Sequence, residues 1–220
     1  MIGAMSAGDV VEVPIFELGL AIVPGEQVPL HIFEQRYRLM IAHCLAEDEP
    51  FGIVLRDDDG ARSIGCTADV AEVVERYEDG RMDIVVTGAE PFGVLDRFEA
   101  PDWPAGQVEI AAPVEPAPGD DARLGAAHSA FAELLEAVGA SRDRAGAAPT
   151  AYAIAAQIEM PPLEKQALLE AGDESDRLVT LEASLRRLLA GLKKSRALGE
   201  RAKTNGHAPG RIGPIQGTPE

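Results

Sequence analysis

Residues 13–37, VPIFELGLAIVPGEQVPLHIFEQRY, decide the fold of this chain. Two short apolar runs, 10–13 and 20–23, are each followed by a proline, Pro14 or Pro24. Since proline removes a backbone hydrogen-bond donor, we expect two short strands that stop at these residues. From position 32 to 45 the apolar side chains recur at helical spacing, which predicts one helix after the strands.

Further short strands are predicted after this helix, at 51–55, 63–77, 82–86, 92–98 and 107–112. Asp79-Gly80 lies between two of them and predicts a β-hairpin with a type I′ turn. Many short strands with one helix and no long crossover connections indicate a small, nearly closed barrel.

The pattern becomes helical in the second half of the chain. Leucine and alanine recur there at i, i+3 and i+7 spacing, which predicts a bundle of about four helices. The fold class is therefore expected to be α+β, a β pseudo-barrel followed by an α-helical bundle. The expected segments are a disordered N-terminus (1–9), the barrel (10–112), a Pro-rich acidic linker (113–121), the bundle (122–198) and a disordered basic tail (199–220).

The charge is strongly negative and unevenly distributed. The net charge is −17, but the sequence from Lys193 onward has six basic and two acidic residues, or +4, so the rest carries −21. An acidic surface repels phosphate, which argues against nucleic acid as the main ligand. The chain shows no signal-peptide pattern and no apolar run of membrane-spanning length. Its two cysteines form no C-x-x-C pair, so a cytoplasmic location is expected.

Motifs for catalysis are absent from the sequence. It contains no P-loop, no G-x-G-x-x-G and no G-x-S-x-G. The four histidines are scattered, and the aspartates at 57–59 lack EF-hand spacing and predict a solvated turn. Glu34 and Arg38 are spaced as an i,i+4 ion pair on a helix. We therefore predict no catalytic, metal-binding or cofactor-binding residues.

Residues 13–37 resemble the opening of the Lon N-terminal, or substrate-binding, domain, with its pattern P-L-F-P-L, P-G, P-L and I-F-E-x-R-Y. Glu17 stands where the family usually has proline. Similar matches follow at 51–55 (FGIVL), 63–68 (SIGCTA), 80–88 (GRMDIVVTG) and 165–170 (KQALLE), so the resemblance extends over about residues 10–192. It implies a PUA-like pseudo-barrel followed by helices, in a stand-alone form without the ATPase and protease domains.

The resemblance assigns a structural role to a set of motif residues: Pro14, Pro24, Gly25, Pro29, Phe33, Glu34, Arg36 and Tyr37. We expect Phe33 and Tyr37 to pack the helix against the barrel. Glu34 and Arg36 are expected to satisfy neighbouring backbone groups or each other.

The leading functional hypothesis is a non-enzymatic module that recognises polypeptide, either unfolded segments or a specific partner protein, in support of protein quality control or proteolysis. An apolar groove or an exposed sheet edge is the expected binding surface, although the sequence does not identify its residues. The alternatives are binding of RNA or a modified nucleotide through the PUA-like barrel, and a small-ligand pocket or unrecognised enzyme.

Overall fold

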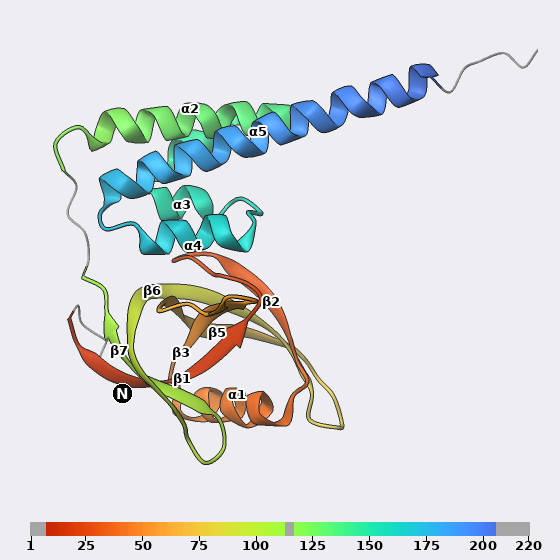
Figure 1. The fold of residues 1–220 in the computed structure, drawn as a ribbon. Helices are drawn as coiled ribbons and strands as arrows, with labels where there is room; N and C mark the ends of the chain where they lie inside the picture. The colour runs from red at the N-terminus through yellow and green to blue at the C-terminus, as the bar shows by residue number, and fades with distance from the viewer. Residues whose placement is uncertain (1–7, 113–116, 206–220) are drawn as a thin grey trace, which may run out of the picture.

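The computed structural model describes residues 8–112 and 117–205, and the side chains in these ranges except those of Arg144 and 199–205. A β-barrel carries a layer of helices at one end and a single helix, α1, at the other (Figure 1). The predicted α+β fold, a barrel followed by a helical bundle, is confirmed.

Five strands close the barrel in the order β1–β7–β6–β5–β3, and β3 returns to pair in parallel with β1. Two strands lie outside this ring, since β4 forms a hairpin with β3 and β2 pairs with β6. The strands are β1 (Val10–Leu18), β2 (Gln27–Ile32), β3 (Phe51–Asp57), β4 (Gly60–Ala61), β5 (Ile64–Arg76), β6 (Met82–Glu99) and β7 (Pro104–Ile110).

The expectation that strands stop at Pro14 and Pro24 is wrong. Pro14 lies inside β1, where it is the last residue paired with β7, and Ile15 begins the pairing with β3. A residue without an N–H is tolerated where the strand changes partner. Residues 20–23 form no strand at all. This buried segment leads into a turn, in which Glu26 N–H donates to the Val23 carbonyl at 3.1 Å.

The hairpin at Asp79-Gly80 forms between β5 and β6, but its turn is not type I′. Gly80 alone in the turn has positive φ, at +83°, and its N–H donates to the Tyr77 carbonyl at 2.9 Å. This is a type I turn followed by a left-handed glycine, the common alternative when the loop is one or two residues longer.

Helix α1 (Gln35–Glu47) begins three residues later than expected, because Ile32 is still paired in β2. Strand β2 was not predicted, although Val28, Leu30 and Ile32 alternate as a strand requires. The helix ends at Asp48, whose φ of +58° is left-handed. Arg38 donates to the Asp79 carbonyl, so the predicted ion pair with Glu34 does not form.

Helices α2 (Asp120–Val138), α3 (Ala151–Ala155), α4 (Pro162–Glu170) and α5 (Glu174–Asn205) form the upper layer, with a 3-10 helix at Arg142–Ala147. Helix α2 therefore begins inside the segment expected to be linker. Helix α5 continues through 199–205, which were expected to be disordered. The remaining parts of the expected terminus, linker and tail (1–7, 113–116 and 206–220) lie outside the described residues.

One hydrophobic core runs from the barrel into the helical layer. Its fully buried members include Phe51 and Ile84 in the barrel and Phe131, Leu181 and Leu185 in the helices. Burying a side chain of this size contributes about 2 kcal/mol. Because the same cluster contains residues of both parts, the helices are held firmly on the barrel.

Candidate apolar binding surface

An open groove runs between α2 and α5 on the helical layer. It has a volume of about 660 Å³. Its lining residues are mostly apolar and come from α2, from the α3–α4 connection and from α5: Phe131, Leu134, Leu135, Val138, Gln157, Ile158, Glu159, Arg187, Leu188, Gly191, Leu192 and Ser195. We call this surface the bundle groove. Val138 is 54% exposed there, so the groove leaves apolar area in contact with water.

The groove forms because the apolar stripe of α5 is buried along only part of its length. The first members of the α5 stripe, such as Leu181 and Leu185, are fully buried, and the helix packs there on α2, α3 and α4. Later members, Leu188 and Leu192, are only half-buried and line the groove instead. The sequence shows one continuous helical stripe, and the periodicity is the same for core and groove positions.

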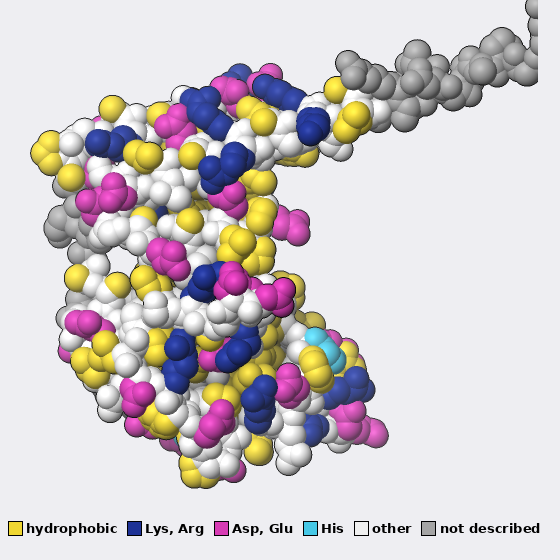
Figure 2. Space-filling model, viewed as in Figure 1, with side chains coloured by type: hydrophobic (Ala, Val, Ile, Leu, Met, Phe, Trp, Pro, Cys, Tyr) yellow, Lys and Arg dark blue, Asp and Glu magenta, His cyan; other side chains and the backbone are white. Residues whose placement is uncertain are grey.

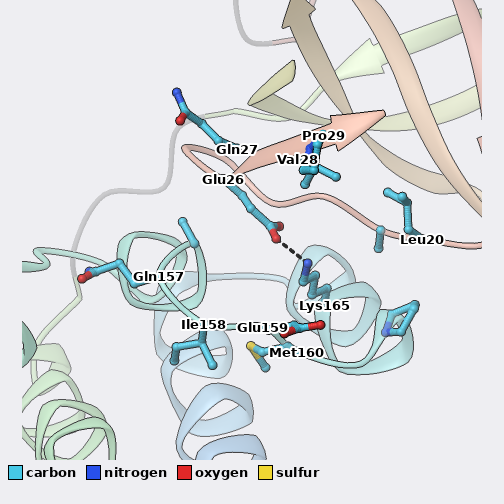
Figure 3. Close-up of a pocket in the computed structure, with 13 residues that line it drawn as sticks. Leu20, Glu26, Gln27, Val28, Pro29, Gln157, Ile158, Glu159, Met160 and Lys165 are labelled. Atoms are coloured by element: carbon cyan, nitrogen blue, oxygen red, sulfur yellow. Dashed lines mark hydrogen bonds and ion pairs between the residues drawn. The ribbon is translucent and has the colours of Figure 1, made fainter. Parts of the chain in front are cut away.

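A second pocket, of about 530 Å³, lies where the helical layer meets the barrel. In Figure 3, Leu20, Val28 and Pro29 line it from the barrel side, and Ile158 and Met160 line it from the helical side. We call it the junction pocket. One of its walls is strand β2, whose other edge pairs with β6; among the described residues no strand pairs with the edge that remains.

The bundle groove and the junction pocket share Gln157, Ile158 and Glu159. They therefore form one continuous surface from the edge of the barrel to the far end of α2. Figure 2 shows hydrophobic side chains gathered along the hollow below the projecting part of α5. Apolar grooves and unpaired sheet edges are surfaces on which polypeptide can bind.

A buried ion pair fixes the two walls of the junction pocket. Lys165 of α4 donates to Oε1 of Glu26 in the turn before β2, and both side chains are at most 10% exposed. The second carboxylate oxygen of Glu26 accepts from the Val23 N–H at 3.2 Å. Nearby, the Gln166 amide donates to the Ile64 carbonyl of β5 at 3.1 Å. These polar contacts set the position of α4 on the barrel.

Of the aromatic and charged motif residues, Tyr37, Arg36 and Glu34 lie as expected and Phe33 does not. Tyr37 is buried, its ring 4.0 Å from that of Phe16, with the Arg36 guanidinium 4.5 Å above it. Arg36 Nε donates to Glu34 at 3.2 Å, so these two side chains satisfy each other. Phe33 does not pack against the barrel: it is 61% exposed, ahead of the helix, with its ring 6.0 Å from that of His31.

Pro24, Gly25 and Pro29 of the motif shape the chain beside the junction pocket. Pro24 and Gly25 form the turn before β2, and Gly25 has a φ of +79°, which favours glycine. Its N–H donates to the Gly88 carbonyl at 2.8 Å. Pro29 lies in the edge strand and lines the junction pocket, as its missing N–H allows.

The barrel has a polar pocket of its own, of about 590 Å³, with three arginines in its lining. Glu17 pairs with two of them, Arg56 at 2.6 Å and Arg97 at 3.5 Å, while Arg36 pairs with Glu34. These pairings give Glu17, which stands where the family usually has proline, a structural role: its carboxylate balances two guanidinium groups. Each arginine already has a carboxylate partner, so the pocket offers no free cation to a phosphate.

Titratable groups elsewhere are arranged in small structural clusters. Asp83 accepts from Tyr77 Oη at 2.7 Å and lies 2.5 Å from His31 Nδ1. Hydrogen bonds from these two partners lower the pKa of the Asp83 carboxyl, and the bond to Asp83 raises the pKa of Tyr77 to about 12. Within residues 8–112 and 117–205, no metal-type group of His, Cys, Asp and Glu occurs.

Both cysteines are buried and unbonded. Burial raises the pKa of the Cys44 thiol to about 12, and it raises that of Cys66 further. A thiol this far from ionisation is a poor nucleophile at neutral pH. Among the helices in the described parts of the chain, none is long and apolar enough to cross a membrane.

A barrel that carries a helical layer in this order is the architecture of a Lon N-terminal domain. The chain belongs to the family of the ATP-dependent protease La (LON) substrate-binding domain, whose model matches residues 12–187. A Lon protease from Paraburkholderia phytofirmans (strain DSM 17436 / LMG 22146 / PsJN) is 25% identical over 202 residues. That match covers 83% of this chain and 25% of the relative, so the chain spans about a quarter of that protein.

Two solved structures share the fold at 22% identity. A Lon N-terminal domain protein from Xanthomonas campestris has a TM-score of 0.60, over 79% of this chain and 98% of its own. The N-terminal domain of a Mycobacterium avium complex Lon protease has a TM-score of 0.67, over 80% of this chain and 98% of its own.

Proposed function

We propose that this chain is a non-enzymatic recognition module that binds unfolded polypeptide segments through the bundle groove and the junction pocket. Membership of a substrate-binding family supports a recognition role. The observation that carries the proposal is the continuous apolar surface shared by the two sites. Polypeptide fits this surface because an unfolded segment offers apolar side chains at short, regular intervals.

The expected affinity is modest. Fully burying one large apolar side chain contributes about 2 kcal/mol, and ordering a flexible segment opposes binding. A few side chains held along the groove would therefore give dissociation constants on the order of micromolar. Weak binding of this kind suits a module that samples many unfolded chains, in support of protein quality control or proteolysis.

A role in the cytoplasm remains a prediction, consistent with two unbonded cysteines. RNA binding is a weaker proposal, because the arginines of the barrel pocket are paired with carboxylates.

The test is fluorescence anisotropy with a labelled, carboxymethylated protein that cannot fold. We expect wild-type protein to bind it and Leu188→Asp, in the bundle groove, to weaken binding at least about tenfold, because a charge in an apolar contact is costly. Leu39→Asp is the matched control, a 44% exposed leucine on α1 at the opposite end of the barrel. Equal binding by wild type and Leu188→Asp would refute the proposal.

A further inference from the structure

The free edge of strand β2 has a definite set of outward backbone groups. Gly88 at the end of the paired part of β6 donates its N–H to the Glu26 carbonyl at 2.9 Å, which fixes the alternation of hydrogen bonds along the pair. In an antiparallel pair, successive residues point their backbone groups alternately toward the partner strand and away from it. The residues whose groups face β6 are therefore Val28, Leu30 and Ile32, and those whose groups face outward are Gln27, Pro29 and His31.

The outward edge offers both donors and acceptors. Pro29 has no N–H, so the donors are the N–H groups of Gln27 and His31, and the acceptors are the carbonyls of all three residues. Within residues 8–112 and 117–205, no hydrogen bond is made to any of these backbone groups. An extended polypeptide carries donors and acceptors at the matching spacing.

Charged side chains do not protect this edge from pairing. Natural edge strands are often protected by charges, by proline or by being covered. The segment from Gln27 to Phe33 contains no Lys, Arg, Asp or Glu, and the preceding Glu26 is held by Lys165. Pro29 removes one donor from the edge, but its carbonyl remains available. The edge is thus restricted rather than closed.

The proline also bears on which partner fits. Two copies of this chain paired along β2 would each bring Pro29 to the new pairing, so a hydrogen bond would be lost at two positions. A polypeptide with free N–H groups loses only one. The edge therefore favours an extended segment of another chain over a second copy of β2.

The outward side chains of β2 lead from the junction pocket to an exposed aromatic ring. Gln27 and Pro29 line the pocket at the start of the strand, and Phe33, just after its end, is 61% exposed. Between them, the ring of His31 lies 6.0 Å from that of Phe33 and is held by Asp83. The strand spans about 20 Å on the flank of the barrel, between the helical layer and α1 (Figure 1). Apolar contacts are thus available at both ends of the free edge.

We propose that the bound polypeptide adds as a β-strand to the free edge of β2, hydrogen-bonded to the backbone of Gln27, Pro29 and His31, with one apolar side chain packed on Phe33. This inference rests on the proposed function and specifies its substrate class. Recognition through the backbone depends little on sequence, as a module that binds many unfolded chains requires. Because alternate side chains of a strand share one face, the preferred segments have an apolar residue at every second position.

The first measurement is amide hydrogen exchange by NMR on the full isotope-labelled chain, with and without a short peptide of alternating valine and threonine. We expect the N–H groups of Gln27 and His31 to exchange at least about tenfold more slowly when the peptide is bound. The N–H groups of Leu30 and Ile32, which face β6, are the internal control and should exchange slowly in both states.

The second measurement is the affinity of the same labelled peptide for variants of β2, by fluorescence anisotropy. His31→Pro removes an outward N–H from an edge strand that already tolerates proline, and it should weaken binding about fivefold relative to His31→Ala, which keeps the N–H. Phe33→Ser should weaken binding about threefold. Leu95→Ser is its control, because it removes a 56% exposed leucine from the part of β6 that does not pair with β2.

The outcomes separate the two proposals. If the peptide binds without slowing exchange at Gln27 and His31, and His31→Pro binds as tightly as His31→Ala, strand addition is wrong and polypeptide binding stands. If neither the peptide nor a carboxymethylated unfolded protein binds wild-type protein, the proposed function fails and the inference fails with it. If Gln27 and His31 become protected at high protein concentration without peptide, a second copy occupies the edge and the inference is overturned.

Discussion

The barrel and the helical layer use the same kinds of residue in opposite ways. In the barrel, the arginines of the polar pocket pair with Glu17 or Glu34, and the inward side chains fill the core. In the helical layer, apolar residues line an open groove, and the last cations of α5 have no partner among the described residues. The difference supports the proposal that the open apolar surface of the helical layer, with β2 at its lower end, is the binding surface and that the rest of the barrel supports it.

The largest expected effect is the loss of stability of the barrel when a side chain is introduced at Gly65. A Cβ at Gly65 would lie 2.5 Å from the Ile53 carbonyl oxygen and 2.7 Å from Phe92 Cζ, so Gly65→Val has no space without backbone movement. We expect a loss of more than about 4 kcal/mol in the free energy of unfolding, or failure to fold. Urea denaturation measures this.

The matched control is Gly93→Ala, at the residue paired with Ile64 beside it, where a Cβ meets nothing within 4 Å. It should change stability by less than about 0.5 kcal/mol. Similar losses of unfolding free energy for Gly65→Val and Gly93→Ala would show that crowding at Gly65 does not determine the stability of the barrel.

The next effect separates core from groove within one helix. Leu185 is fully buried, so Leu185→Ala should cost about 4 kcal/mol. Leu188, one turn later, is half-buried in the groove wall, and Leu188→Ala should cost under about 1.5 kcal/mol while weakening polypeptide binding. Both are measured by urea denaturation and anisotropy, and a larger stability loss at Leu188 than at Leu185 would contradict the assignment.

Features of the fold that depend on local sequence patterns could be predicted from the sequence. The barrel with its hairpin and the helical spacing of α2 and α5 were predicted, because each depends on a local pattern. Local chemistry was sufficient for these features.

The binding surface could not be predicted in the same way. Leu185 and Leu188 belong to one stripe, and only the packing of α4 and α2 decides which of them is buried. Strand β2 was not predicted; it contains Pro29, and the free edge that tolerates a proline is a tertiary feature. The junction ion pair joins Glu26 to Lys165, far apart in the sequence, and no local pattern links them.

The next prediction concerns this ion pair, because it joins the helical layer to the barrel. Removing one partner leaves a buried charge unpaired, so Lys165→Met should cost about 3 kcal/mol. The double variant Glu26→Gln/Lys165→Met should recover a large part of the loss, and a double-mutant cycle by urea denaturation gives the coupling. Additive effects of the two substitutions would show that the pair does not hold α4 on the barrel.

The smallest expected effect is a loss of stability at acidic pH. The Arg187 guanidinium, followed by the Ser184 hydroxyl, lowers the pKa of Glu164 below its ordinary value of 4.5. A carboxyl with a lowered folded-state pKa stabilises the fold above its unfolded value, and the contribution disappears as pH falls through the folded value. We expect less than about 1 kcal/mol, lost below pH 4.5 and absent in Glu164→Gln. Urea midpoints against pH measure it, and identical profiles for the two proteins would contradict it.

The most direct test of the central claim is site-specific photo-crosslinking. A photoreactive phenylalanine analogue is placed at Val138 in the bundle groove or at Arg56 in the barrel pocket, and each protein is irradiated with a carboxymethylated unfolded protein. The account predicts efficient crosslinking from position 138, suppressed by excess unlabelled peptide, and little from position 56. Crosslinking from position 56 with none from position 138 would place recognition on the barrel and contradict the account.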